Sequence, residues 1–423
     1  MKEMDAYIIV TGGNRLFGET EVLAAKNAVL PIIACCIMIK GTVVLHGCEP
    51  LTDVLNMLRI VESLGGTCAF EGSDITVDCS GLSRHVVGRE LSGALRSSVF
   101  ILGSLISRMR AAELSYPGGC DIGPRPIDLH LEGLRALGVE LEEDEEKIGC
   151  DGRGLHSGNV TLAFPSVGAT ENLIMAATLT PGRTVIRNAA AEPEIVDLCS
   201  FITAMGGHAR LTGNTAVVDG VERLHGGEYT PIADRIAAGT YLVAGAMCGG
   251  RVTVTGADSE FLIPVTGILR AAGAHVTERP FSLTVESDGN LRMIRRLETQ
   301  PYPGFPTDLQ APVSAMMAVS RGRGYIIENL FENRYRHTRA LRRMGADITI
   351  CGRAATVRGR SLHGAEVEAE DLRGGAALVL AALKARGTSV ITGLHHIDRG
   401  YYRLEDKLSA LGGDIKRVKK PCV

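Results

Sequence analysis

One segment of the sequence places a cysteine and an arginine in a loop. Residues 116–126 contain three glycines and three prolines in eleven positions, a composition that predicts a loop rather than a helix or a strand. Cys120 follows two glycines, and Arg125 comes five residues later. An exposed cysteine close to a positive charge meets the conditions for a reactive thiol. An ordinary turn cysteine is the equally weighted alternative.

A cation and an amide stand where an apolar helix is expected to begin. Lys26 and Asn27 come directly before the apolar stretch 28–39. Free backbone N–H groups at a helix N-terminus, together with these side chains, could bind a phosphate or a carboxylate. Taken alone, Lys26 is better explained as a surface lysine.

Further arginines occur in both halves of the chain. Arg334, Arg373 and Arg399 lie in the second half, in or near predicted strand-to-helix connections, whereas Arg96 and Arg125 lie in the first half. Each of them could simply be solvated. A cleft lined from two domains by these residues would be strongly positive, as an anionic substrate requires.

A single carboxylate follows a turn in the second half. Asp308 lies in the sequence Phe-Pro-Thr-Asp-Leu-Gln at 305–310. A general base needs one carboxylate within hydrogen-bonding distance of a substrate hydroxyl, and Asp308 could supply it. The alternative is that Asp308 is the N-cap of a following helix.

The elements that must position these residues form an internal repeat. A glycine follows a predicted amphipathic helix and precedes a predicted strand at six places, with spacings of 73, 68, 67, 72 and 67 residues: Gly65, Gly138, Gly206, Gly273, Gly345 and Gly412. Each unit is expected to contain a strand, the helix with the glycine as its C-cap, and two further strands. Strand 7–10 has no helix before it and could complete the last unit.

Six such units could form one ring, two domains of three units each, or an open solenoid. The length favours two domains of about 200 residues. Residues 226–231 have the best composition for a linker between them.

The composition excludes several classes of protein. With 45 Lys and Arg against 48 Asp and Glu, the net charge of -3 provides no basic field for a nucleic acid or an anionic membrane. The cysteines include no C-x-x-C pair and the histidines no H-E-x-x-H motif, so we expect no metal. The longest apolar run, 29–39, is too short to span a membrane, and the first residues show no export signal, so a cytoplasmic location is expected.

Ten short segments occur in the order typical of one family: 25–28, 117–120, 123–130, 166–170, 192–196, 234–235, 305–308, 331–334, 371–373 and 396–400. Over essentially its full length, the chain resembles the UDP-N-acetylglucosamine 1-carboxyvinyltransferases. These are the enolpyruvyl transferases of the EPSP synthase superfamily that open bacterial peptidoglycan synthesis.

The resemblance implies an α/β fold, a two-domain inside-out α/β prism. Six βαβαββ repeats, three per domain, would bury their helices around a pseudo-threefold axis. The first domain would span 22–229 and carry the catalytic loop 116–126, and the second would combine 1–21 with 230–423. The active site would lie in the cleft between the two domains.

The resemblance also implies a reaction. The enolpyruvyl group of phosphoenolpyruvate would be transferred to the 3'-hydroxyl of UDP-N-acetylglucosamine by addition and then elimination of phosphate, with no metal and no organic cofactor. Cys120 matches the catalytic cysteine of the family, which protonates the methylene carbon of phosphoenolpyruvate, can form a covalent adduct with it, and is alkylated by fosfomycin. Whether the acid or the adduct role dominates is left open.

Site residues follow from the same resemblance. Besides Cys120, the implied catalytic residues are Asp308, which would take the proton from the 3'-hydroxyl, Lys26 and Arg399. The residues implied to bind phosphoenolpyruvate are Lys26, Asn27, Arg125, Arg334, Arg373 and Arg399. Those implied to bind UDP-N-acetylglucosamine are Asn27, Arg96, Arg125, Pro126, Ile127, Asp128, Leu129, Ser166, Val167, Gly168, Asp308 and Leu330.

Two departures and two alternatives accompany the resemblance. Some members have a lysine where this chain has Thr52 and Phe164, which changes the expected contacts with the nucleotide. A shikimate-pathway enolpyruvyl transferase is one alternative, but it lacks the loop cysteine. A catalytically silent relative that binds a UDP sugar is the other, and the retention of Cys120, Asp308 and the arginines argues against it.

Overall fold

The computed structural model describes residues 6–116 and 127–419 of the chain. Contacts divide these residues into two compact units, each with its own hydrophobic core. The first unit comprises residues 24–116 and 127–232, and the second comprises 6–23 and 233–419. The sequence-based boundaries were placed after residues 21 and 229, where the structure has 23 and 232.

The first unit consists of helices and three four-stranded sheets among its described residues. Its helices are α1 (Lys26–Cys36), α2 (Thr52–Ser63), α3 (Arg89–Ala94), the 3-10 helix η1 (Arg96–Phe100), α4 (Ile101–Met109), α5 (Asp128–Ala136), α6 (Val167–Thr178) and α7 (Pro193–Ala204). Its strands are β3 (Thr42–Leu45), β4 (Thr67–Glu71), β5 (Asp74–Asp78), β6 (Val86–Val87), β7 (Ala111–Ser115), β8 (Glu140–Glu143), β9 (Lys147–Asp151), β10 (Asn159–Thr161), β11 (Gly182–Arg187), β12 (His208–Thr212), β13 (Thr215–Gly220) and β14 (Gly227–Tyr229). The sheet orders are β14-β3-β5-β4, β6-β7-β9-β8 and β10-β11-β13-β12.

The second unit is built in the same way. Its helices are α8 (Arg235–Cys248), η2 (Ser259–Leu262), α9 (Ile263–Ala271), η3 (Thr307–Leu309), α10 (Gln310–Val319), α11 (His337–Arg343), α12 (Leu372–Lys384), α13 (Leu394–Ile397) and α14 (Leu404–Ala410). Its strands are β1 (Ala6–Thr11), β2 (Leu16–Glu21), β15 (Gly250–Thr255), β16 (His275–Arg279), β17 (Ser282–Ser287), β18 (Arg296–Glu298), β19 (Arg323–Ile327), β20 (Asp347–Cys351), β21 (Ala354–Arg358), β22 (Glu366–Glu368), β23 (Thr388–Thr392) and β24 (Asp414–Lys419). The sheet orders are β16-β17-β15-β2, β18-β19-β21-β20 and β22-β23-β1-β24.

All six sheets share one pairing pattern. One parallel pair, such as β10 with β11, is followed by two antiparallel pairs, such as β11 with β13 and β13 with β12. In the last repeat the antiparallel partner of β23 and β24 is β1. The N-terminal strand therefore completes the last unit, as the sequence allowed. The segment 226–231, expected to be a linker, instead contains β14, which pairs with β3 and closes the first sheet; its backbone hydrogen bonds outweigh its loop-like composition.

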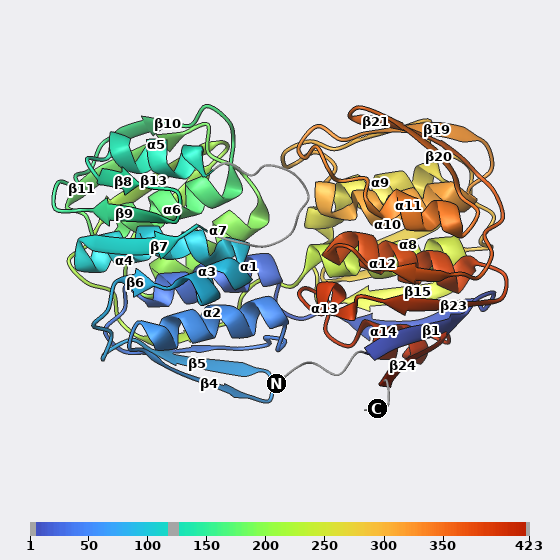
Figure 1. Cartoon of the computed structure of the whole chain (residues 1–423), viewed down its shortest axis with the longest axis horizontal. Coiled ribbons are helices and arrows are strands. Elements are labelled where there is room, and N and C mark those ends of the chain that lie inside the picture. Colours follow the sequence, from blue (N-terminus) through green and yellow to red (C-terminus); the bar gives the residue numbers. More distant parts are fainter. Residues whose placement is uncertain (1–5, 117–126, 420–423) are drawn as a thin grey trace. The chain divides into compact units, whose positions relative to one another are not determined.

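The helices at the centre of each unit are buried on nearly all sides. Thirteen of the fourteen residues of α8 and twelve of the thirteen of α12 are buried, which is typical of helices that are apolar around their whole circumference. Figure 1 shows α8, α10 and α12 side by side in the second unit, where they pack on one another. The structure thus confirms the predicted α/β fold of repeated units with buried helices.

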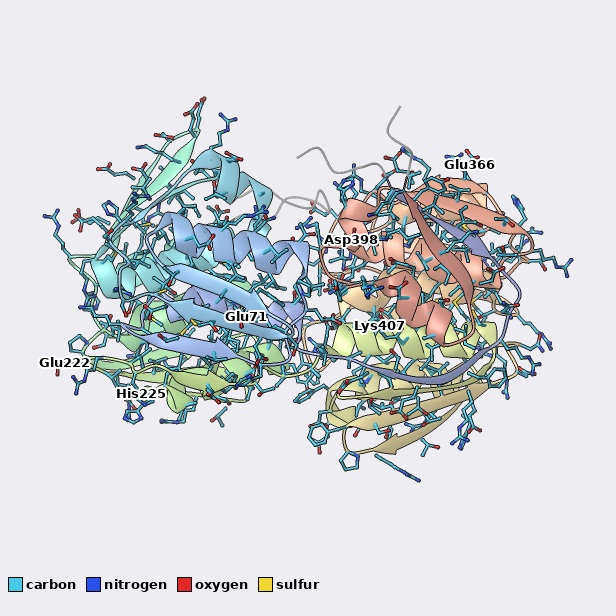
Figure 2. All side chains as sticks on the ribbon, turned by 90° about the horizontal axis from the view of Figure 1, so that it is seen from below. Glu71, Glu222, His225, Glu366, Asp398 and Lys407 are labelled. Carbon is cyan, nitrogen blue, oxygen red and sulfur yellow. The ribbon has the colours of Figure 1, made fainter. Side chains whose placement is uncertain are left out.

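Outer strands of the sheets alternate between exposed and less exposed positions. Strand β4, for example, alternates exposed and half-buried positions, as expected for an antiparallel sheet with one solvated face. Figure 2 shows the exposed side chains of Glu71, Glu222 and Glu366 at the surface. Among the residues that the structure describes, we find no helix whose length and hydropathy would suit a membrane span.

The glycine that marks each repeat has a conformational reason. In all six repeats its φ lies between 86° and 102°, a region that side-chain-bearing residues rarely adopt and that ends helices through a left-handed C′ residue. At Gly138 an added Cβ would also lie only 2.4 Å from the carbonyl oxygen of Gly154. The repeat was therefore visible in the sequence because any residue with a side chain would be strained in this backbone conformation.

Asp197 of α7 holds the last segment of the first unit. The hydroxyl of Tyr229 donates to Oδ1 of Asp197 at 2.6 Å, and the N–H of Ile232 donates to Oδ2 at 3.1 Å. The Asp197 side chain is buried. Burial raises its pKa to about 6, although the two hydrogen bonds oppose this shift.

We expect the substitution Asp197→Asn to stabilise the protein above pH 6. Because the pKa of Asp197 is higher in the folded state, the free energy of unfolding falls as the pH rises from about 4 to about 6, by about 3 kcal/mol in total. Asparagine carries no charge, and it can accept from Ile232 while donating to the Tyr229 hydroxyl. Urea unfolding of the unsubstituted chain and of Asp197→Asn across this pH range measures the difference between their free energies of unfolding. If that difference did not change with pH, the raised pKa of Asp197 would be contradicted.

Candidate functional site

Asp308 lies at the junction of two helices in the second unit. It is the middle residue of η3, which runs directly into α10. The N-cap residues of these two helices are Pro306 and Leu309, and neither helix has a side-chain cap. The N-cap alternative for Asp308 is therefore wrong, and its carboxylate is used elsewhere.

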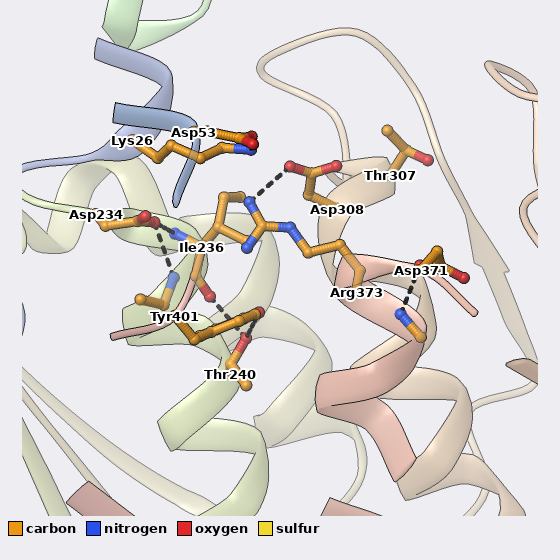
Figure 3. A network of polar contacts seen from close by, with 12 residues as sticks. Lys26, Asp53, Asp234, Ile236, Thr240, Thr307, Asp308, Asp371, Arg373 and Tyr401 are labelled. Carbon is orange, nitrogen blue, oxygen red and sulfur yellow. Dashed lines mark hydrogen bonds and ion pairs between the residues drawn. The ribbon is translucent and has the colours of Figure 1, made fainter. Parts of the chain in front are cut away.

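Two buried arginines hold the carboxylate of Asp308. Nη2 of Arg334 donates to Oδ1 at 2.6 Å. Nη2 of Arg373 donates to Oδ2 at 2.9 Å, as Figure 3 shows. The arginine side chains are 5% and 3% exposed, whereas that of Asp308 is 26% exposed. Two guanidinium charges favour the ionised carboxylate. The geometry therefore presents an ionised, partly accessible carboxylate that could accept a proton.

Arg373 is fixed from several sides. It lies in the first turn of α12, whose N-cap Asp371 accepts the N–H of Gly374 at 2.8 Å. The ring of Tyr401 lies 5.2 Å from its guanidinium carbon. Burial lowers the pKa of Arg373, but the charges led by Asp308 outweigh burial and raise it above its ordinary value. Its Nε and Nη1 have no hydrogen-bond acceptor among the described residues, so this rigid cation could bind an anion.

Arg399 lies in the loop between α13 and α14, and its two flanks are anchored. On one side, Asp398 accepts two hydrogen bonds from Arg417 of β24, at 2.9 and 2.6 Å. On the other side, the buried hydroxyl of Tyr401 shares a hydrogen bond with Thr240 at 2.9 Å. The backbone that carries Arg399 is therefore held by the sheet and by the central helix α8, while its own side chain is partly exposed.

In the first unit, Lys26 is paired instead of solvated. Its Nζ donates to Oδ2 of Asp53 at 3.0 Å, and the two side chains are 12% and 2% exposed (Figure 3). The lysine begins the central helix α1, whose N-terminus is capped by no side chain. The surface-lysine alternative is therefore wrong, and the site offers a positive charge beside free backbone N–H groups.

A second buried network of the first unit involves Arg96. Oδ1 of Asn172 accepts the N–H of Gly103 at 2.8 Å, so its amide nitrogen donates to Nδ1 of His130, also at 2.8 Å. Burial, and then the charge of Arg96, lower the pKa of His130 to about 3. His130 is therefore neutral at pH 7. Burial also lowers the pKa of Arg96.

The N-terminus of α6 lies against this network. Oγ of Ser166 accepts the N–H of Ala169 at 3.3 Å and caps the helix. A Cβ on Gly168 would lie 2.9 Å from the His130 ring, so only glycine fits there without a shift. Phe164, one of the two departures from the family pattern, is 46% exposed just before this helix.

Within each unit, the structure brings some of the predicted site residues together. Three other predicted site residues are not among the residues that it describes. In the second unit Asp308, Arg334 and Arg373 form one hydrogen-bonded cluster. The first unit carries Lys26, Asn27, Arg96, Ile127, Asp128, Leu129, Ser166, Val167 and Gly168, and the second carries Leu330 and Arg399 as well. Cys120, Arg125 and Pro126 lie outside the described residues.

Several supporting residues were not predicted from the sequence. Asp53 holds Lys26, Tyr401 stacks under Arg373, and His130 and Asn172 support α6. The one available signal was a polar residue at an otherwise apolar position of a predicted helix, as with Asp53 in α2. Among the described residues, no group of three or more His, Cys, Asp or Glu side chains is arranged to hold a metal.

Comparisons with known proteins agree over nearly the whole chain. A family model described as EPSP synthase (3-phosphoshikimate 1-carboxyvinyltransferase) matches residues 10–408. UDP-N-acetylglucosamine 1-carboxyvinyltransferase 2 of Caldanaerobacter subterraneus subsp. tengcongensis is 47% identical over 413 residues, which are 97% of this chain and 99% of that protein. UDP-N-acetylglucosamine 1-carboxyvinyltransferase 1 of Symbiobacterium thermophilum is 46% identical over 97% of this chain and 95% of its own.

A solved structure supports the fold. The enolpyruvyl transferase NikO from Streptomyces tendae matches 99% of this chain and 100% of its own with a TM-score of 0.89. Its sequence identity is 23%, so this likeness concerns the fold alone.

Proposed function

The chain belongs to the EPSP synthase family of enolpyruvyl transferases, and we propose that it transfers the enolpyruvyl group of phosphoenolpyruvate to the 3'-hydroxyl of UDP-N-acetylglucosamine, releasing phosphate. This reaction is the first committed step of peptidoglycan synthesis. The observation that carries the proposal is the near full-length identity to proteins named for this activity. The buried arginine pair around Asp308 supports it on physical grounds.

The residues of the second unit fit the proton transfer that the reaction needs. The 3'-oxygen must lose its proton as it attacks C2 of phosphoenolpyruvate, and Asp308 is an ionised carboxylate able to accept that proton. Charge of oxocarbenium type at C2 would also be stabilised by a nearby carboxylate. We assign Arg373, Arg334 and Arg399 to the phosphate and carboxylate of phosphoenolpyruvate, because guanidinium groups bind both kinds of anion with paired hydrogen bonds.

The residues of the first unit fit anion and sugar-nucleotide binding. Lys26 and Asn27 stand at an uncapped helix N-terminus, where backbone N–H groups and a cation together attract phosphate. We assign Arg96, the segment 127–129, and Ser166 to Gly168 to UDP-N-acetylglucosamine, together with Leu330 and Asp308 of the second unit. Arg125 and Pro126 belong to the same assignment by resemblance.

Cys120 is assigned as the group that delivers a proton to the methylene carbon of phosphoenolpyruvate. The same thiol, as thiolate, could instead form the covalent adduct, and it is the residue that we propose fosfomycin alkylates. Elimination then removes a proton from the new methyl group and expels phosphate, which restores the double bond. No metal or organic cofactor takes part in these steps as we propose them.

The test is phosphate release by the purified full-length chain in the presence of phosphoenolpyruvate, without added metal. We expect release with UDP-N-acetylglucosamine and a product whose mass is that of enolpyruvyl-UDP-N-acetylglucosamine. Shikimate 3-phosphate is the matched acceptor control and should give no release. The substitution Cys120→Ala should reduce release by about 10²-fold, the size of a lost general acid, and fosfomycin should reduce it in the unsubstituted chain only.

Other outcomes would identify a different function. Release with shikimate 3-phosphate alone would indicate the shikimate-pathway reaction. If the chain binds UDP-N-acetylglucosamine but releases no phosphate, the remaining alternative is a catalytically silent relative that binds a UDP sugar. If fosfomycin still inhibits the residual activity of Cys120→Ala, the residue that it alkylates is not Cys120.

A further inference from the structure

A buried glutamate lies beside the Asp308 cluster and accepts four hydrogen bonds. Glu328 follows β19 and is 0% exposed. Its Oε1 accepts from Oγ1 of Thr299 at 2.9 Å and from the backbone N–H groups of Leu330 and Phe331 at 2.9 and 3.1 Å. Its Oε2 accepts from Oγ1 of Thr307 at 3.0 Å. A carboxyl with two acceptor oxygens is the side chain that can satisfy this many donors at once.

These hydrogen bonds join two segments that the proposed function uses. Thr307 directly precedes Asp308 in η3, and its side chain lies next to Asp308 in Figure 3. Leu330 and Phe331 belong to the stretch that leads to Arg334. Glu328 therefore connects the turn that carries the carboxylate with the backbone that leads to one of its two arginines.

Thr307 is also held from its other end. Nε and Nη2 of Arg334 lie 3.4 and 3.3 Å from the carbonyl oxygen of Thr307, to which they donate. The hydroxyl is fixed by Glu328 and the carbonyl by Arg334, so this residue has little freedom to rotate. Both anchors act on the residue next to Asp308.

We propose that Glu328 is a positioning residue, which sets the place of the Asp308 carboxylate through the hydroxyl of Thr307. The inference rests on the proposed function, because it assigns Asp308 to the proton transfer. Glu328 touches no reacting atom in this proposal. A shift of about 1 Å in a catalytic group can lower a rate about 10²-fold.

The test uses single threonine substitutions in the full-length chain. Thr307→Val removes the hydroxyl but keeps the size of the side chain, and Thr307→Ser restores a hydroxyl. Thr253→Val is the matched control, because Thr253 of β15 shares a part-buried hydroxyl contact with Thr284 at 2.9 Å in the same unit. For each variant, kcat, the KM of each substrate and the melting temperature are measured in the phosphate-release assay.

We expect Thr307→Val to lower kcat roughly tenfold or more, with the KM for phosphoenolpyruvate nearly unchanged. Thr307→Ser should recover most of the lost kcat, and Thr253→Val should keep the unsubstituted kcat at a comparable melting temperature. Thr307→Ala serves as the second variant if Thr307→Val does not fold. It removes the same hydroxyl and should show the same loss of kcat.

Three results would overturn the inference. They are an unchanged kcat in Thr307→Val or Thr307→Ala, no recovery in Thr307→Ser, or an equal loss in Thr253→Val. Failure of the proposed function looks different, because the unsubstituted chain would then release no phosphate with UDP-N-acetylglucosamine.

Discussion

Replacing Asp308 by asparagine is expected to lower kcat about 10³-fold in the phosphate-release assay, within the range lost with a general base. The amide has nearly the shape of the carboxylate but cannot take the proton of the 3'-hydroxyl. Its single oxygen can still accept from Arg334 or from Arg373. The loss should therefore appear mainly in kcat, while the KM for UDP-N-acetylglucosamine changes little.

The same substitution should also lower the free energy of unfolding. One of the two buried guanidinium groups would face the amide N–H₂ instead of an acceptor, which costs about 1–3 kcal/mol for an unsatisfied buried donor. The melting temperature should therefore fall, and assays must be run well below it. A protein that is folded by circular dichroism yet inactive supports the assignment of Asp308.

Asp258→Asn is the matched control for this experiment. Asp258 caps η2 in the same unit by accepting the N–H of Glu260 at 3.0 Å, and asparagine caps helices about as well as aspartate. Both its kcat and its stability should remain unchanged. A kcat for Asp308→Asn within a few-fold of the control would remove Asp308 from the proton transfer.

The repeat and the fold class could be predicted because each depends on local sequence. The six glycines are required by a positive φ at a helix end, and the alternating strands around them follow the period of two. The place of β1 was left open, since its pairing with β23 and β24 joins the two ends of the chain. The β14 segment was missed because Gly227 makes a short edge strand look like a loop.

The connections inside the site could not be predicted from the sequence. Asp308 lies in η3, Arg334 in the turn before α11 and Arg373 in α12, and their side chains meet only in the folded unit, where both arginines donate to Asp308. The burial of the Lys26 side chain was missed for the same reason. A lysine at the start of an apolar helix is usually exposed, but α1 is a central helix, and the Lys26 ammonium group is held by Asp53 of α2.

Replacing Arg373 by methionine is expected to lower kcat/KM for phosphoenolpyruvate about 10³-fold, because losing one partner of a buried, hydrogen-bonded charge pair weakens binding by about 2–5 kcal/mol. Methionine fills a similar volume without a charge. The donors Nε and Nη1, which have no acceptor among the described residues, would be lost, together with the hydrogen bond from Arg373 to Asp308. The KM for UDP-N-acetylglucosamine should change much less.

Arg373→Lys separates charge from geometry. Lysine keeps the positive charge but presents a single ammonium group in place of the planar fork, and it cannot stack on Tyr401 in the same way. If charge alone matters, Arg373→Lys should retain nearly full kcat/KM. We expect instead a loss of about 10²-fold, intermediate between the unsubstituted chain and the methionine variant, because a bidentate anion contact requires the guanidinium.

Arg296→Met is the control for loss of a charged pair in the same unit. Arg296 is 65% exposed and pairs with Glu298 at 2.8 Å, and such surface pairs contribute about 0–1 kcal/mol. Its kcat/KM should stay at the unsubstituted value. Equal kcat/KM values for Arg373→Met and Arg296→Met would show that Arg373 does not bind the substrate anion. If only Arg373→Met loses activity, and only in kcat/KM for phosphoenolpyruvate, the result would instead indicate that Nε and Nη1 of Arg373 bind the substrate anion.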